Sequence, residues 1–237
     1  MMKLKVIIPN SGMTRETLDQ RERMLLRYAW PNTEISVDCI EGGPESIESD
    51  YDEVLACPYV VKLAIEAEKD GFDGLIVYCG SDPAVKACRE VVDIPVIAPG
   101  KASQMIALDL GYKFSILTVL DTCVSRDTEA VYEKGFPLER LASVRAIGIP
   151  VSDIGTDSDA SFMALVDAGR KCIADGAQCI VLSCLGMAGL GEKLQKILGI
   201  PVLDPAPVSV QYAQALVRLG LSQSRTAYPK PPDKSRI

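Results

Sequence analysis

No histidine occurs among the 237 residues of the sequence. This absence excludes the Ser-His-Asp and Cys-His arrangements of nucleophilic enzymes, and it excludes metal sites built on imidazole ligands. Acid–base chemistry near neutral pH must therefore come from Cys, Asp, Glu, Lys or Tyr side chains with suitable pKa values. The carboxylates form no cluster with the spacing of metal ligands, so we expect no metal site.

Three further features are missing, and each narrows the class of protein. No uninterrupted run of about 18 apolar residues occurs, so we expect no membrane span. The first apolar run stops at Pro9-Asn10, which is too short for a secretory signal. The formal charge of -7 argues against a nucleic-acid or anionic-membrane partner. The 8 cysteines contain no CxxC pair, so we interpret them as reduced thiols of a cytoplasmic protein and not as zinc ligands.

Short β-branched apolar runs alternate along the chain with longer amphipathic stretches. This alternation predicts an α/β protein with parallel strands, and a hydrophobic content of 48% is enough for a substantial core. We expect strands over residues 5–8, 34–39, 74–78, 96–97, 113–117, 143–146, 179–183 and 202–203. We expect helices over residues 16–28, 53–70, 84–91, 101–109, 127–134, 159–175, 189–197 and 208–219. The tail from residue 222 onward is rich in Pro, Ser and Lys, and we expect it on the surface.

An internal repeat indicates two similar halves. The segment Asp70–Cys79 matches Asp175–Cys184, and both the Asp-Gly pairs and the terminal cysteines are offset by 105 residues. Each copy follows an amphipathic stretch and precedes an Ile-Pro-Val strand start. We therefore expect two similar α/β lobes related by a pseudo-twofold axis, one formed by residues 1–97 plus 208–237 and the other by residues 98–207.

The repeat places two cysteines at equivalent positions. Cys79 and Cys184 each follow a buried strand, and in parallel α/β sheets ligands gather outside the carboxyl ends of the strands. Small residues come next, so a substrate can approach the backbone amides, and a following helix N-terminus favours a thiolate and an anionic substrate. Two lobes with this symmetry would point both thiols into one cleft. The alternative for any single cysteine is a small hydrophobe in a packed core.

A facing pair of thiols suits one reaction in particular. Inversion of a carbon acid needs a base on one face and an acid on the other, and a thiol with a pKa of roughly 8.5 can serve in either role. We expect one of the two cysteines to be a thiolate in the resting enzyme and the other a thiol.

Five segments, spread over nearly the whole chain, carry motifs of one enzyme family. They are Ile8–Thr14, Gly43–Glu53, Cys79–Pro83, Cys184–Ala188 and Leu219–Ser224. These segments resemble the aspartate/glutamate/hydantoin racemase superfamily, and within it the hydantoin and allantoin racemase branch. The two cysteine motifs are specific when they occur together in this order.

The resemblance implies two Rossmann-like, flavodoxin-like lobes with the active site in the cleft between them, no cofactor, and racemisation by the cysteine pair. It also implies contacts with the substrate's ring amides and carbonyls, for which the candidates are Asn10, Ser46, Ser81 and Thr118, although Asn and Ser also serve as turn or cap residues. The backbone and side chains beside the cysteines, at Gly80, Leu185 and Gly186, are further candidates. Relatives of this kind often assemble, so we expect a homo-oligomer.

The expected substrate is a hydantoin with one substituent at C5, a class that includes allantoin. The Cys-Asn-Thr and Cys-Thr motifs of the amino-acid racemases are not present, which argues against aspartate and glutamate. Three alternatives stay open: an amino-acid racemase, a maleate-type cis–trans isomerase of the same superfamily, and a two-lobed module that only binds a small molecule.

Overall fold

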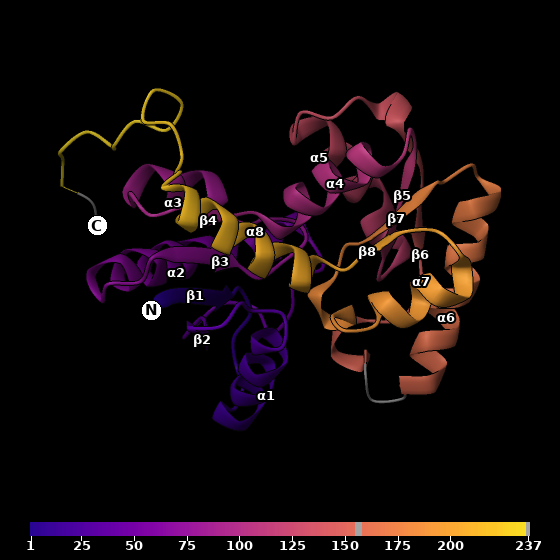
Figure 1. The fold of residues 1–237 in the computed structure, drawn as a ribbon, viewed down its shortest axis with the longest axis horizontal. Coiled ribbons are helices and arrows are strands. Elements are labelled where there is room, and N and C mark those ends of the chain that lie inside the picture. Colours follow the sequence, from indigo (N-terminus) through magenta and orange to yellow (C-terminus); the bar gives the residue numbers. More distant parts are fainter. Residues whose placement is uncertain (155–157, 236–237) are drawn as a thin grey trace.

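Two four-stranded parallel sheets form the framework of the protein in the computed structural model, which describes residues 1–154 and 158–235. The strands are β1 (Met2–Ile8), β2 (Thr33–Cys39), β3 (Gly74–Val77), β4 (Val96–Ile97), β5 (Phe114–Thr118), β6 (Leu141–Ala146), β7 (Cys179–Leu182) and β8 (Val202–Leu203). Their spatial orders, β2-β1-β3-β4 and β6-β5-β7-β8, are the same arrangement used twice. The expected α/β architecture with two similar lobes is confirmed (Figure 1).

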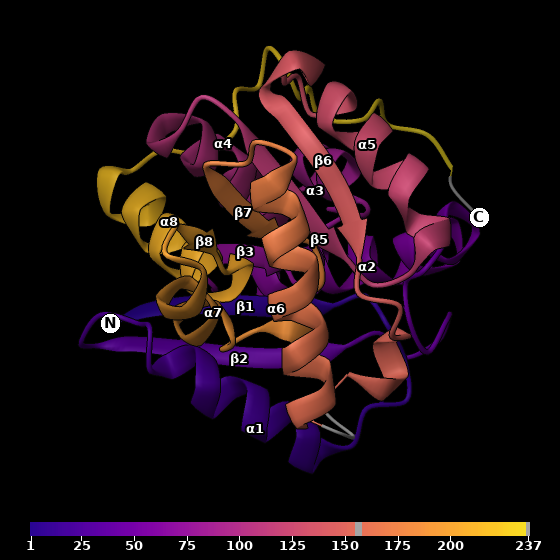
Figure 2. The same ribbon diagram turned by 90° about the vertical axis from the view of Figure 1, so that its right-hand side faces the viewer.

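Eight α-helices cover the two sheets in the described part of the chain. They are α1 (Arg15–Leu26), α2 (Asp50–Lys69), α3 (Val85–Val91), α4 (Pro99–Leu110), α5 (Val124–Glu133), α6 (Ser158–Ala174), α7 (Gly191–Leu198) and α8 (Pro205–Leu219). The core on one face of the first sheet takes side chains from α1 and α8, and the core on its other face takes them from α2 and α3. The second sheet lies between α6 and α7 on one side and α4 and α5 on the other (Figure 2).

Two helices cross from one sheet to the other. Helix α4 follows β4 of the first sheet but packs on β7, whereas α8 follows β8 of the second sheet and packs on β3. The two crossing helices also contact each other, which joins the lobes through helix packing. These contacts fit the division at residues 97 and 207 that we expect from the sequence, although that domain boundary itself stays a prediction.

Several helices begin earlier than the sequence pattern predicts, because a capping residue precedes them. Helix α2 begins at Asp50, where the Ser49 hydroxyl accepts a hydrogen bond from the Asp52 amide at 3.2 Å. Helix α8 begins at Pro205 and not at residue 208, because Asp204 caps it and a proline in the first turn gives up no helical hydrogen bond.

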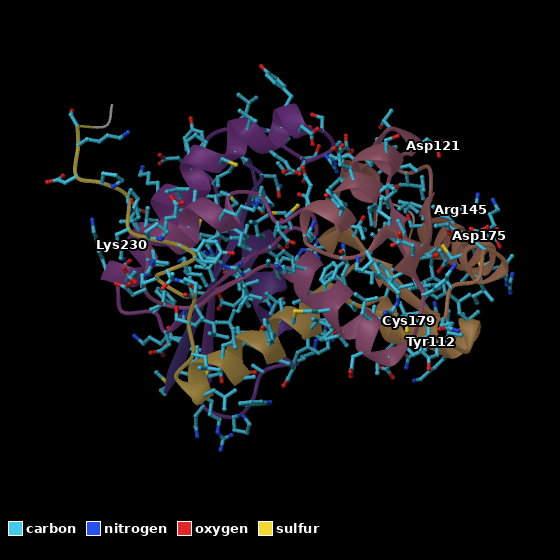
Figure 3. The ribbon with its side chains drawn as sticks, turned by 90° about the horizontal axis from the view of Figure 1, so that it is seen from above. Tyr112, Asp121, Arg145, Asp175, Cys179 and Lys230 are labelled. Atoms are coloured by element: carbon cyan, nitrogen blue, oxygen red, sulfur yellow. The ribbon has the colours of Figure 1, made fainter. Side chains whose placement is uncertain are left out.

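The tail beyond α8 lies on the edge of the first lobe, as expected. Gln223 donates to the carbonyls of Val92 and Ile94, and Lys230 donates to the Val91 carbonyl at 3.0 Å. Figure 3 shows Lys230 at the opposite end of the molecule from Arg145 and Asp175, which lie side by side on the second lobe. None of the helices that the structure describes is long and apolar enough to cross a membrane.

Candidate active site

The ends of strands β3 and β7 bring the two predicted cysteines to one cavity. Cys79 lies two residues beyond β3, and Cys184 lies two residues beyond β7. Because these strands occupy the same place in the two sheets, their carboxyl ends meet where the lobes meet. Both thiols line a cavity of about 540 Å³. This volume is in the range of small-molecule sites.

Gly80 allows the chain segments that follow β3 and β7 to lie in close contact. A Cβ atom at this position would lie 1.7 Å from the Ser183 carbonyl oxygen of the other lobe. Gly100, at the start of α4, also lies close to Gly80, since a Cβ atom at position 100 would lie 1.8 Å from the Gly80 carbonyl oxygen. Only glycine permits such backbone contacts. Gly80 is one of our substrate-binding candidates, but it is not among the residues that line the cavity, and its contacts position the two cysteines.

The loop after Cys79 is strained and fixed by its own side chains. Asp82 and Ala84 have φ angles of 65° and 58°, in the left-handed region that such residues seldom adopt. The Asp82 carboxylate accepts hydrogen bonds from the amides of Gly100 and Lys101, each at 2.8 Å, and it lies 3.6 Å from the Lys134 ammonium. Strain of this kind persists only where surrounding contacts enforce it.

The two thiols have different hydrogen-bond partners. The Cys79 thiol lies 3.2 Å from the Ser81 hydroxyl, whereas Cys184 Sγ accepts a hydrogen bond from the Gly186 amide at 3.3 Å. Burial raises the pKa of Cys79 to about 11. It also raises the pKa of Cys184 to about 12, despite the Gly186 amide. Each hydrogen bond favours the thiolate, but desolvation outweighs it.

The raised pKa values of both thiols bear on our expectation that one of the two cysteines is a thiolate in the resting enzyme. Desolvation disfavours the charged form of both thiols, so the structure does not single out which cysteine would be the thiolate, and the expectation of one thiolate and one thiol stays a prediction. The sequence cannot show this desolvation, because the depth of the thiols depends on how the lobes close over them.

The other predicted site residues divide into two groups. Those that line the cavity with the cysteines are Asn10, Ser81, Thr118, Leu185 and Gly186. Ser46 does not line it, although its neighbours Glu45 and Ile47 do. The loop therefore reaches the site, but it presents the side chains on either side of Ser46.

Several residues that we did not predict also line the cavity. The first group is polar and includes Arg21, Tyr78, Arg126 and Asp127. The Tyr78 hydroxyl is buried without a hydrogen-bond partner, and burial raises the pKa of this phenol, which keeps it neutral. Arg126 lies at the start of α5, with its Nε 3.6 Å from the Asp127 carboxylate. The second group is apolar and includes Met13, Ile47, Val151 and Ile154.

The position of Arg126 could have been anticipated. Helix α5 follows β5, so its start lies at the same sheet edge as the cysteines, where ligands gather. The sequence pattern predicted a helix there but placed its start at residue 127. The extra turn brings Arg126 into the helix and toward the cavity.

A second cavity of about 470 Å³ adjoins the first. Ser81, Arg126 and Asp127 line both cavities, so their side chains form part of the wall between them. Glu53, Asp82 and Lys134 line the second cavity only. In the described parts of the chain, no group of three or more Cys, Asp or Glu side chains is arranged to hold a metal ion.

Comparison with known proteins places this site in a family. Residues 4–213 match the model of the Asp/Glu/Hydantoin racemase family. A hydantoin racemase from Pseudomonas sp. (strain NS671) is 34% identical over 236 residues, which cover 98% of this chain and 93% of that protein. Among solved structures, an allantoin racemase from Pseudomonas fluorescens is 32% identical with a TM-score of 0.91, and 100% of both chains is covered. An allantoin racemase from Klebsiella pneumoniae is 30% identical with a TM-score of 0.88, and the match covers 100% of this chain and 96% of that one.

The match extends over most of the chain and includes both cysteine motifs and the elements that carry them. The chain therefore belongs to the Asp/Glu/hydantoin racemase family, and it is an enzyme, a racemase.

Proposed function

We propose that this racemase inverts C5 of hydantoins that carry one substituent there, allantoin among them, with Cys79 and Cys184 as acid and base. One observation supports the proposal above the others: the two thiols reach a single cavity from equivalent strands of two similar lobes. Relatives similar over nearly the whole chain are a hydantoin racemase and allantoin racemases, which supports the substrate class.

The reaction begins with one of the two cysteines as a thiolate. It removes the proton at C5, and the electron pair of the broken C–H bond spreads onto the neighbouring ring carbonyl as an enolate. The opposite thiol then donates its proton to the other face of C5. The base leaves the reaction as a thiol and the acid leaves as a thiolate, so the same pair is ready for the opposite enantiomer. This exchange of roles requires no cofactor.

The cavity wall offers groups that would stabilise the developing oxyanion. The backbone amides after each cysteine, the Ser81 hydroxyl and the buried Thr118 hydroxyl lie at the ends of β3, β5 and β7. Donors fixed in this way cost little reorganisation when charge appears in the transition state. Asn10, from the loop after β1, would hold a ring amide or carbonyl.

The apolar and polar parts of the wall would both meet the C5 substituent. Ile47, Val151 and Ile154 suit an alkyl or aryl group, whereas Arg126 and Asp127 suit a polar one. The proposal therefore covers the class of C5-substituted hydantoins and does not select one substituent. A homo-oligomer in the cytoplasm belongs to the same proposal, and the eight free cysteines support a reducing compartment.

Loss of optical rotation tests the proposal. Enantiopure allantoin and benzyl-, isopropyl- and methylthioethyl-hydantoin are incubated with the wild type, Cys79→Ser, Cys184→Ser and the control Cys39→Ser, which lies on β2 outside both cavities. We expect each catalytic serine variant to lose about 10²–10⁴-fold in rate, because the pKa of a serine hydroxyl is far too high for the exchange of roles. The control should keep its activity. Full activity in either catalytic variant, or no racemisation of any hydantoin by the wild type, would contradict the proposal.

A further inference from the structure

The chain passes between the two lobes at one edge of each sheet. It leaves the first sheet after β4 and returns after β8, and β4 and β8 are edge strands. The opposite edges are β2 and β6, and each of these strands leads into a helix of its own lobe, α2 or α6. Strands β3 and β7, which carry the cysteines, lie between the two edges. The β2 and β6 edges therefore depend on noncovalent contacts to stay together.

Glu48 makes such contacts. It lies in the loop between β2 and α2, whereas Val151 lies in the segment that follows β6. The Val151 amide donates a hydrogen bond to Glu48 Oε1 at 2.8 Å, and the Cys123 thiol donates one to the Glu48 carbonyl oxygen at 3.4 Å. Both donors belong to the second lobe. One residue of the first lobe thus binds the second lobe through its side chain and through its backbone.

The loop that carries Glu48 is fixed to the first lobe at both ends. The Ser11 amide donates to the Pro44 carbonyl at 2.8 Å, which holds the start of the loop. At its end, the Asp52 carboxylate of α2 accepts hydrogen bonds from the Glu48 amide at 3.1 Å and from the Ser49 hydroxyl at 2.7 Å. Because the loop cannot move alone without breaking these bonds, the contacts of Glu48 restrain one lobe against the other.

The two segments that Glu48 joins also form part of the wall of the active-site cavity. Ile47, next to Glu48, lines the cavity from the first lobe, and Val151 and Ile154 line it from the second. The hydrogen bond between Glu48 and Val151 therefore sets how closely these apolar side chains approach each other across the cavity.

We propose that Glu48 holds the two lobes closed over the active-site cavity, and that the cavity opens at the β2 and β6 edges when the hydrogen bond to Val151 breaks. The lobes turn about the crossings after β4 and β8, where α4 and α8 pack against each other. Closure shields the thiols from water and brings Ile47 and Val151 against the C5 substituent. Glu48 touches no reacting atom, so it is a positioning residue. Its role in catalysis rests on the proposed racemisation, but its role in closure does not.

The cysteines of the protein provide the test, because each can be followed separately. Thiols are alkylated with iodoacetamide without substrate, and the rate at each cysteine is measured by peptide mass spectrometry. Cys79 and Cys184 line the cavity and report its opening. Cys88 and Cys172 are fully buried in the cores of the first and second lobes, so they report global unfolding.

Four variants remove or preserve the proposed contact. Glu48→Ala removes the acceptor, and Glu48→Gln keeps Oε1 in place. Val151→Pro removes the donor from the other lobe, and proline is tolerated at the first position of the short helix Val151–Asp153. The control is Glu41→Ala, in the loop after β2, whose carboxylate pairs with Lys62 inside the first lobe. Circular dichroism confirms that each variant is folded.

Alkylation of a closed cavity proceeds through the open state, so its rate follows the fraction of open molecules. We expect Glu48→Ala and Val151→Pro each to raise the rates at Cys79 and Cys184 about tenfold, because each breaks a hydrogen bond to a charged acceptor. The double variant should be no faster than either single one, since both remove the same bond. Glu48→Gln should stay much closer to the wild type, and Glu41→Ala should match it.

Two outcomes of the alkylation experiment would overturn the proposal. Unchanged rates at Cys79 and Cys184 in Glu48→Ala would mean that Glu48 does not hold the cavity closed. An equal rise at Cys88 and Cys172 would mean that the substitution loosens the whole fold and not the contact between the lobes.

Racemisation by the same variants separates closure from the proposed function. We expect Glu48→Ala to raise the KM for a hydantoin about two- to tenfold and to keep its kcat, because a bound substrate restores the closed state. Glu48→Gln should recover most of the loss. A lowered kcat with unchanged KM would refute the role in closure. If the alkylation rates agree with closure but the wild type racemises no hydantoin, the closure stands and the proposed function fails.

Discussion

Replacement of Gly80 by alanine tests how the two cysteines are positioned. The added Cβ would lie 1.7 Å from the Ser183 carbonyl oxygen and 2.6 Å from its carbonyl carbon. Real Cβ contacts essentially never fall below 3.0 Å, so the two strand ends must separate by at least 1.3 Å. Gly80 adjoins Cys79 and Ser183 adjoins Cys184, so most of this movement must pass directly to the thiols.

We expect Gly80→Ala to lose about 10²-fold or more in kcat, because a displacement of about 1 Å in a catalytic geometry costs that much. The overpacked contact should also cost about 1–3 kcal/mol of unfolding free energy. Initial rates of racemisation by circular dichroism and thermal unfolding measure the two effects separately.

Gly74→Ala is the matched control on the same strand. Its Cβ would lie 3.2 Å from the tips of the Leu4 and Val217 side chains, which can shift by a few tenths of an ångström. This variant should lose some stability and keep its kcat. If Gly80→Ala folds with wild-type kcat, the close contact between the strand ends does not set the cysteine geometry. A raised KM with unchanged kcat would instead favour our sequence-based assignment of Gly80 to substrate binding.

Two further predictions concern stability. The Arg145 guanidinium holds the pKa of Asp175 down to about 2, so the stabilisation of the fold by this ion pair should be complete above the ordinary pKa near 3.8 and vanish as the pH falls toward 2. Because the pair is partly exposed, Asp175→Asn should lose only about 1 kcal/mol of unfolding free energy in urea at pH 7. A difference in unfolding free energy between wild type and variant that persists at pH 2 would contradict this origin. The buried Asp204 carboxylate accepts hydrogen bonds from the amides of Gly189 at 2.6 Å and Ala206 at 3.0 Å, so Asp204→Ala should lose about 2–3 kcal/mol of unfolding free energy, and a loss under about 0.5 kcal/mol would refute its role as a cap.

The sequence was sufficient to predict the fold because local signals and the repeat agree. Every expected strand and helix is present in the structure, and the errors are at the ends of elements. The start of α8 shows why: Asp204 and Pro205 are ordinary start signals, but the pattern of apolar residues becomes regular only at Val208. The meeting of Cys79 and Cys184 at one cavity also followed from the repeat, since equivalent strands of similar lobes end at the same edge.

What could not be predicted depends on how the lobes dock. The role of Gly80 comes from a carbonyl more than one hundred positions away in the sequence, at Ser183. The burial of the two thiols, which raises both of their pKa values, depends on how deep they lie once the lobes have come together. Ser46 differs for a local reason: the loop turns its neighbours toward the cavity. Spacing along the sequence carries no signal for such contacts.

The measurement that tests the two-thiol mechanism most directly is proton NMR of C5 in D₂O at pH 7, with one pure hydantoin enantiomer followed at low conversion. Each thiol holds a single exchangeable proton, so the acid delivers solvent deuterium while the base can return only the substrate's own proton. We predict that the inverted product carries deuterium at C5 and that the remaining substrate keeps its hydrogen. In Cys79→Ser and Cys184→Ser we expect no inverted product, so the C5 proton signal of the substrate should persist. Product that keeps the original hydrogen, or equal deuterium in product and remaining substrate, would contradict a mechanism with one cysteine on each face.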